Sequence, residues 1–194
     1  MTIIDAFVFF NELDLLEVRL QELYSVVDWF VLGESDKTHS GQPKPAHYAA
    51  NRQRFARWND KIRHIFIADQ EAGSSLAATR RREMGQRNEI LKGLLGDPDD
   101  TLVMISDLDE IPRREIVAGL PGKIPDGTIG VFIQKLHYYN VNTYAPDRPW
   151  PGSRIATAAD VRALSPHVIR CGLGQPDGYY PRYGQINNGG WHYS

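Results

Sequence analysis

Two carboxylates stand two residues apart where an apolar segment ends. Asp107 and Asp109 follow the run Thr101-Leu102-Val103-Met104-Ile105, which has the continuous apolar character of a strand buried on both faces. Ligands of mainly parallel sheets gather at the carboxyl ends of the strands. Mg²⁺ and Mn²⁺ prefer oxygen ligands, and Mg²⁺ usually takes only one or two protein carboxylates when a substrate supplies phosphates. The pair therefore predicts a site that holds a divalent cation against a phosphate.

An Asp-x-Asp triplet has a simpler interpretation as well. Most such triplets are solvated turns or helix caps, and Asp109 or Glu110 could cap a helix that begins at Pro112. The buried strand that leads into this triplet favours the metal site over the cap.

Arginines in a helix predicted over residues 75–95 could contact a diphosphate. Arginine can form two parallel hydrogen bonds with phosphate oxygens, which makes Arg82 and Arg87 candidates. The competing interpretation is a solvated helix face, on which Glu83 and Arg87 form an ordinary surface ion pair.

Two further acids follow predicted strands at residues 3–10 and 29–33. Glu12 and Glu34 are both expected at the ligand edge of the sheet. Glu34 could accept hydrogen bonds from a ribose or a base edge, whereas Glu12 could equally cap the helix that follows it.

A late segment, Gly189-Gly190-Trp191-His192-Tyr193, places a histidine beside a glycine pair and two aromatic residues. Neutral imidazole could complete the coordination of a metal held by Asp109, although a lone histidine is more often structural. His137 is the other histidine of interest. Some aromatic residues could stack on sugar faces, although most aromatic residues fill cores. These are Tyr138, Tyr139, Trp150, Tyr179 and Tyr180.

Strand and helix patterns alternate along the chain. Besides the strands above, residues 62–67, 101–105 and 128–136 read as strands, and residues 13–27, 48–58 and 112–120 read as helices. In the first helix Leu16, Leu20 and Leu23 form an apolar face, and Arg19 is placed among the polar residues of the other faces. Residues 138–154 read as irregular, and loops are expected from residue 172 onward. The alternation predicts a single α/β domain, a three-layer α/β/α sandwich with a mostly parallel sheet.

Composition narrows the functional classes. A net charge of −2 gives no basic field for nucleic acid. Cys171 is the only cysteine, so no internal disulfide can form, and no membrane span or signal peptide appears, which favours a cytoplasmic protein. The phosphate-loop, dinucleotide-binding and nucleophile-elbow motifs are absent, which disfavours ATPases, dinucleotide dehydrogenases and hydrolases of the elbow type. The oligomeric state is not predicted.

Several distinctive segments follow one another along the chain. They are Phe10-Asn11-Glu12-Leu13-Asp14, Gly33-Glu34-Ser35, Arg82-Glu83 with Arg87-Asn88, Ser106-Asp107-Leu108-Asp109-Glu110-Ile111-Pro112, Trp150 with Gly152 and Arg154, and Gly189-Gly190-Trp191-His192-Tyr193-Ser194. In residue type and order they resemble glycosyltransferase family seventeen, the family of the bisecting N-acetylglucosaminyltransferase of N-glycans. The resemblance spans nearly the whole chain.

The resemblance implies a GT-A-type nucleotide-diphospho-sugar transferase fold, a divalent metal (Mn²⁺ or Mg²⁺), UDP-N-acetylglucosamine as donor, a saccharide acceptor and inversion at the anomeric carbon. Asp109 would bind the metal, with Asp107 on the ribose or a metal-bound water, and His192 looks like the late metal-ligand histidine of many GT-A enzymes. Residues 1–110 would form the nucleotide-sugar half and residues 111–194 the acceptor half. The implied nucleotide-sugar contacts are Asn11, Glu12, Glu34, Arg82, Arg87, Asn88 and Arg154.

Inversion also requires a carboxylate that takes the proton of the acceptor hydroxyl. Glu110, next to the metal pair, and Asp177, in the late loop region, are the two candidates.

The chain departs from the animal enzymes at both ends. It starts at its first strand without a membrane anchor, which suggests a bacterial or viral member, and it stops at Ser194, so an acceptor-binding element is expected to be missing. Two other readings stay open. A nucleotidyltransferase uses paired acids on a similar sheet, but usually has a glycine-rich loop where this chain has Phe10-Asn11-Glu12. A non-catalytic carbohydrate-binding or scaffolding module would use its acids only as helix caps.

Overall fold

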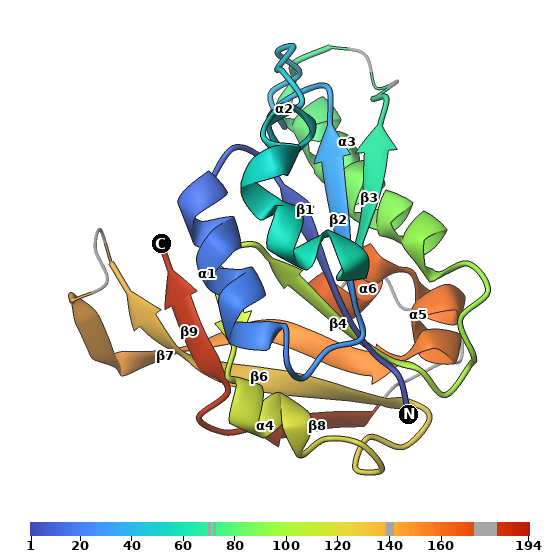
Figure 1. Ribbon diagram of the computed structural model, residues 1–194, viewed down its shortest axis with the longest axis vertical. Coiled ribbons are helices and arrows are strands. Elements are labelled where there is room, and N and C mark those ends of the chain that lie inside the picture. Colours follow the sequence, from blue (N-terminus) through green and yellow to red (C-terminus); the bar gives the residue numbers. More distant parts are fainter. Residues whose placement is uncertain (70, 72, 139–141, 173–181) are drawn as a thin grey trace.

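One mixed sheet organises the chain in the computed structural model, which describes residues 1–69, 71, 73–138, 142–172 and 182–194 (Figure 1). Within these residues the strand order is β3-β2-β1-β4-β7-β6-β9-β5, and β8 also pairs with β6. The strands are β1 (Ile3–Phe9), β2 (Trp29–Ser35), β3 (Ile62–Ile67), β4 (Leu102–Asp107), β5 (Glu110–Pro112), β6 (Thr128–His137), β7 (Tyr144–Thr157), β8 (Arg182–Ile186) and β9 (Gly190–Tyr193). The helices are α1 (Leu13–Leu23), α2 (His47–Ala50), α3 (Leu76–Asn88), α4 (Arg114–Ala118), α5 (Ala158–Leu164) and α6 (Pro166–Cys171), with 3₁₀ helices η1 (Arg52–Lys61) and η2 (Glu89–Leu94).

The amino-terminal half of the sheet is parallel. β1 lies between β2 and β4, and β3 extends the sheet beyond β2. β4 is buried from Leu102 to Ser106, as expected of a strand covered on both faces. The predicted α/β fold with a mostly parallel sheet is confirmed.

Two apolar cores lie on opposite faces of this sheet, because successive side chains of a strand point to opposite sides. Phe7 and Phe9 of β1 pack with Leu16 of α1 and with buried residues of α2 and η1. Ile4 and Ala6 of the same strand pack on the other side with buried residues of η2, α5 and α6. Figure 1 shows α1 and α6 on opposite sides of β1 and β4, which gives the predicted three layers. In the described part of the chain no helix combines the length and apolar character needed to cross a bilayer.

The carboxyl-terminal half corrects two predictions. Residues 144–157 form the long strand β7 rather than irregular structure, and residues 182–186 and 190–193 form strands rather than loops. Pro146, Pro149 and Pro151 hide β7 in the sequence, because proline is unfavourable inside a sheet. The pairing of β7 with β6 shifts register in two places, and such irregularities accommodate prolines.

The helix expected from Pro112 begins later. Pro112 ends β5, and α4 starts at Arg114. β5 pairs antiparallel with β9, which places Glu110 opposite His192. Gly190 permits this approach, since its φ is 137° and a Cβ there would overlap the carbonyl oxygen of Ile111. Gly190 therefore allows His192 to lie beside the acidic turn.

Helix α1 buries a charge that the sequence analysis places on a polar face. Arg19 is fully buried together with Leu16, Leu20 and Leu23. Residues 16, 19, 20 and 23 are spaced as i, i+3, i+4 and i+7, so they share one face of a helix. The placement of Arg19 among the solvated residues is therefore wrong.

Candidate active site

The Asp-x-Asp triplet forms the turn between β4 and β5. Leu108, at its centre, is 5% exposed and belongs to the core. The side chains of Asp107 and Asp109 are 42% and 35% exposed. Burial of the leucine between them therefore leaves two accessible carboxylates at the carboxyl end of the parallel strands, where the sequence places them.

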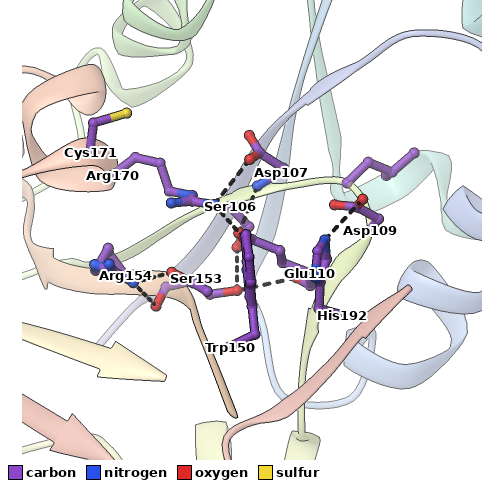
Figure 2. Close-up of polar contacts among 12 residues, drawn as sticks. Ser106, Asp107, Asp109, Glu110, Trp150, Ser153, Arg154, Arg170, Cys171 and His192 are labelled. Carbon is purple, nitrogen blue, oxygen red and sulfur yellow. Dashed lines mark hydrogen bonds and ion pairs between the residues drawn. The ribbon is translucent and has the colours of Figure 1, made fainter. Parts of the chain in front are cut away.

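Two arginines hold the carboxylate of Asp107, and Figure 2 shows one of them, Arg170. Oδ1 accepts a hydrogen bond from Nη2 of Arg87 at 2.8 Å, and Oδ2 accepts one from Nη2 of Arg170 at 3.0 Å. Burial alone would raise the pKa of Asp107, but the two guanidinium groups hold that pKa below its usual value. Arg87 is a predicted site residue, whereas Arg170, on α6, has no neighbouring motif that reveals it.

Asp109 lies against the late histidine, as Figure 2 shows. Oδ2 of Asp109 is 3.2 Å from Nε2 of His192. The imidazole stacks on the indole of Trp150, with ring centroids 4.4 Å apart and an interplanar angle of 21°. Its other nitrogen, Nδ1, is buried without a hydrogen-bond partner among the described residues. The stack and the β5–β9 pairing thus direct Nε2 toward Asp109.

Asp109 and His192 offer a metal one oxygen and one nitrogen donor, which suits Mn²⁺. Among the residues that the structure describes, no group of three or more His, Cys, Asp or Glu side chains is arranged to hold a metal. Asp107, the third predicted ligand, has both oxygens on arginines. A donor set of this size fits a cation that also binds substrate phosphates, and falls short of a cage made by the protein alone.

Glu110 is fully buried beneath the turn and linked to several groups. Its Oε1 accepts hydrogen bonds from Arg170 and, at 2.6 Å, from Nε1 of Trp150, while Oε2 accepts one from the Asp107 amide at 3.1 Å. Burial raises the pKa of Glu110, the Arg170 cation opposes that change, and the charge of Asp107 adds to it. Glu110 therefore joins α6, β7 and the motif turn, and its carboxylate has no open direction toward the cleft.

A second charge lies under the same turn. Nη1 of Arg19 donates hydrogen bonds to the carbonyl oxygens of Asp107, Leu108 and Glu110, at 3.1, 3.1 and 2.8 Å. Its Nε and Nη2 bind both carboxylate oxygens of Asp5. Sequence reasoning missed Arg19 and Asp5. The signal was present, because an arginine on an apolar helix face and an acid inside a buried strand each need a partner.

A cleft of about 640 Å³ opens beside the turn, within the range typical of small-molecule sites. The carboxyl ends of β1 and β4, the 37–44 loop and α3 form its walls. Glu12, Arg87, Asp107 and Asp109 of the predicted set line it, together with basic residues such as Lys44. The structure thus brings four predicted site residues to one cavity.

Glu12 and Asn11 follow β1 at the mouth of this cleft. The Glu12 carboxylate accepts hydrogen bonds from the amides of Phe10 and Asn11, at 3.3 and 3.0 Å, and makes no side-chain cap to α1. Glu12 therefore shapes the loop before the helix, and Asn11 lies exposed beside it.

Glu34, in contrast, is fully buried at the end of β2. Its oxygens accept hydrogen bonds from the amides of Tyr48 (2.7 Å) and Ala49 (3.3 Å), and His64 Nε2 lies at 3.1 Å. Burial would raise the pKa of Glu34, but the bonds from His64, Tyr48 and Ala49, together with Lys44, hold it below its usual value. In this structure Glu34 tethers α2 to the sheet and leaves no free oxygen for a ribose.

Arg82 is also buried, and its hydrogen bonds go to loops. It donates to the carbonyls of His39 (2.8 Å), Glu71 (3.0 Å) and Gly73 (2.9 Å), and its Nε lies 3.0 Å from Oδ2 of Asp69. The structure therefore separates Arg82 from Arg87, although they stand five residues apart on one helix.

The remaining predicted residues lie elsewhere. Asn88 accepts a hydrogen bond from the His167 amide at 2.9 Å and so ties α3 to α6. Arg154 donates to the carbonyl of Pro151 at 2.7 Å. Burial lowers the pKa of Arg154, and the positive charge of the neighbouring Arg170 lowers it further. Figure 2 shows Arg154 on the opposite side of the cluster from Asp109. Asp177 lies outside the described residues.

Solved structures share the fold, among them two glycosyltransferases. The mannosyltransferase PcManGT from Pyrobaculum calidifontis, in complex with GDP-Man and Mn²⁺, superimposes with a TM-score of 0.56 at 12% identity, covering 99% of this chain and 56% of that one. The galactosyltransferase LgtC, in complex with donor and acceptor sugar analogues, gives a TM-score of 0.54 at 12% identity, covering 95% and 73%. These similarities show the predicted GT-A fold.

Comparison of sequences identifies named relatives and a family. The beta-1,4-mannosyl-glycoprotein 4-beta-N-acetylglucosaminyltransferase of Rattus norvegicus is 32% identical over 131 residues, which cover 64% of this chain and 24% of the rat protein. The human protein of the same name is 32% identical over 123 residues, 60% of this chain and 22% of its own length. The chain thus spans about a quarter of the length of these relatives. The model of glycosyltransferase family 17 matches residues 1–147, and the chain therefore belongs to that family.

Proposed function

We propose that this chain transfers N-acetylglucosamine from UDP-N-acetylglucosamine to a saccharide acceptor, with the help of a divalent metal and with inversion at the anomeric carbon. The observation that carries the proposal is the partly exposed Asp109 carboxylate, which lines the cleft and lies 3.2 Å from Nε2 of His192. Family membership and the activity named for the relatives support the transferase over the nucleotidyltransferase and the binding module.

Asp109 and His192 would hold the metal, with the donor diphosphate supplying the remaining oxygens. When bound, the metal would neutralise the negative charge that develops on the leaving diphosphate. Trp150 keeps the imidazole in place through its stack on His192, and it also hydrogen-bonds Glu110. Rigid support of this kind matters because a ligand must meet the metal without first reorganising.

Arg87 would orient the diphosphate. Its guanidinium lines the cleft and reaches Asp107 at 2.8 Å, so a phosphate oxygen near Asp107 would be within reach of the same fork. Asp107 would place this arginine, and its lowered pKa keeps it charged for that task. Arg82 contacts loop carbonyls and has no such part in the proposal.

The base that accepts the proton of the acceptor hydroxyl is proposed to be a residue other than Glu110. Both oxygens of Glu110 accept hydrogen bonds from Arg170, Trp150 and the turn, and the side chain is 1% exposed. A base must reach the hydroxyl directly or through one water. Asp177 therefore stays the proposed base, on the sequence argument alone.

Calorimetry would test the proposed function. UDP-, GDP- and CMP-sugars would be titrated into the chain with Mn²⁺ and then with EDTA. We expect binding of UDP-N-acetylglucosamine that requires Mn²⁺, and its loss in Asp109→Asn. Asp99→Asn is the matched control, because Asp99 is an exposed acid paired with Arg162. Equal binding in EDTA, or a preference for another nucleotide, would contradict the proposal.

A further inference from the structure

An ion pair without access to solvent lies directly beneath the Asp-x-Asp turn. Arg19 of α1 and Asp5 of β1 are both 0% exposed, with Nε to Oδ2 at 2.7 Å and Nη2 to Oδ1 at 2.6 Å. The guanidinium carbon lies 4.6 Å from the ring centroid of Phe7. Two bonds to one carboxylate fix the guanidinium plane, and this leaves Nη1 facing the turn.

The turn wraps around that nitrogen. Nη1 of Arg19 donates hydrogen bonds to the carbonyl oxygens of Asp107, Leu108 and Glu110, all within 3.1 Å. The remaining carbonyl, that of Asp109, accepts a hydrogen bond from the Tyr193 amide at 3.0 Å. All four carbonyls of residues 107–110 are therefore held, and with them the direction in which the two aspartate side chains leave the backbone.

Stability alone does not account for such a pair. Replacement of a buried ion pair by well-packed apolar residues is often neutral or stabilising, because two charges no longer lose their water. An apolar pair could fill the same space between α1 and β1, but it would offer the three carbonyls no donor. The distinctive contribution of Arg19 is therefore its hydrogen bonding to the turn.

We propose that Arg19, oriented by Asp5, is a positioning residue for the metal and diphosphate site: it sets the shape of the 107–110 turn and so the placement of Asp107 and Asp109. Arg19 does not line the cleft among the described residues, so it would act only through the turn. This inference rests on the proposed function for its catalytic consequence, but the shape of the turn can be tested without it.

The test compares three proteins with the wild type. The double variant Asp5→Leu with Arg19→Met removes the pair while keeping the space filled. Arg19→Lys keeps the charge but offers a single nitrogen in place of the fork. Arg54→Met is the matched control, since Arg54 pairs with Asp14 and Glu17 of the same helix α1 at the surface.

The first measurement is backbone hydrogen exchange without metal or nucleotide. We expect amides of residues 105–113 and 190–194 to exchange at least about tenfold faster in the double variant, with β2 and β3 unchanged. Arg19→Lys should give an intermediate rate, and Arg54→Met the wild-type rate. Wild-type exchange at the turn in a folded double variant, or in Arg19→Lys if the double variant fails to fold, would overturn the proposal.

The second measurement is Mn²⁺-dependent binding of UDP. Loss of a residue that supports metal ligands typically weakens metal affinity about 10- to 100-fold, and we expect that loss in the double variant. Unchanged affinity would overturn the positioning role. A wild-type chain that binds no nucleotide with Mn²⁺ would instead refute the proposed function, and the exchange rates would still decide whether Arg19 shapes the turn.

Discussion

Glu34 and Asp109 are acids at the carboxyl ends of two parallel strands of one sheet, yet their surroundings differ. Glu34 is fully buried and its oxygens accept hydrogen bonds from α2 and His64. The side chain of Asp109 is 35% exposed and lies beside His192 on the wall of the cleft. Position at the carboxyl edge of the sheet is common to both. What distinguishes a candidate ligand is a carboxylate whose hydrogen-bonding capacity the fold has left free.

The same contrast separates two buried arginines of α3. Arg82 donates to three loop carbonyls and pairs with Asp69. Arg87 pairs with Glu83 and Asp107 beside the cleft. Both are less than 5% exposed, so burial alone does not tell them apart. The place of their carboxylate partners does, because Asp107 and Glu83 line the cleft, whereas Asp69 is not among the residues that line it.

Asp109→Asn should give the largest effect on activity. Loss of its charge removes the proposed metal ligand, and we expect the rate of UDP release to fall at least about 10³-fold, or about 4 kcal/mol in the activation barrier. The thermal midpoint should stay within about 2 °C, because the asparagine keeps an acceptor for its neighbour. A coupled assay of UDP release and a thermal melt would check both results.

Asp99→Asn supplies the control, as another exposed acid paired with a single cation. A variant at position 109 that keeps near wild-type transfer would remove Asp109 from the mechanism, and with it the contrast with Glu34.

The carboxyl edge of the sheet could be predicted, because parallel strands are buried on both faces and therefore appear in the sequence as continuous apolar runs. Apolar continuity located β1, β2 and β4, and hence the acids at their ends. Whether an acid is free could not be predicted, because this depends on residues distant along the chain. The oxygens of Glu34 accept hydrogen bonds from amides of α2, which follows β2 along the chain. Arg170 of α6, which binds Asp107, is 63 residues away from it in the sequence.

The second half of the sheet was harder to predict for a related reason. β7 pairs with β4 and β9 pairs with β5, partners far along the chain, and β7 carries three prolines, which are unfavourable in a strand. Trp150 was noted as an aromatic residue and as part of the family resemblance, but nothing local shows that its ring stacks on His192. The burial of Arg19, in contrast, could be predicted from the sequence, because its spacing with Leu16 and Leu23 places it on the apolar face of α1.

Glu34→Ala should lower stability and leave transfer unchanged, the opposite of the effects expected for Asp109→Asn. It leaves two amide donors and His64 without their acceptor in a buried site, so we expect the free energy of unfolding to fall by about 3 kcal/mol. Transfer by the folded protein should stay near the wild-type rate. Urea unfolding would measure the first effect and UDP release the second. Full stability combined with lost transfer would return Glu34 to the list of donor contacts.

The arginine pair allows a smaller but matched comparison. Arg87→Lys loses the planar fork that reaches Asp107, and we expect Mn²⁺-dependent UDP affinity to fall about tenfold, or about 1.4 kcal/mol. Arg82→Lys should leave that affinity unchanged and lower stability, because loop carbonyls lose their donors. Calorimetry and urea unfolding on both variants would test this. Equal loss of affinity would mean that the two arginines act together.

The smallest effect concerns pH and again separates Glu34 from exposed acids. Its pKa in the folded chain is held below that of an unfolded glutamate, which is about 4.3, so the unfolded state binds more protons in the window below about pH 5. Glu34 therefore stabilises the fold above the unfolded pKa, and that contribution is lost as pH falls through the folded pKa.

Glu34→Gln cannot titrate, so its free energy of unfolding should decrease less steeply than that of the wild type between about pH 5 and pH 3. Asp14→Asn, at a side chain that is 94% exposed, is the control for loss of an acid at the surface. A slope for Glu34→Gln equal to that of the wild type would show that the contacts of Glu34 do not favour its charged form. The buried side chain at β2 would then stabilise the fold through its packing and hydrogen bonds, without a contribution from its charge.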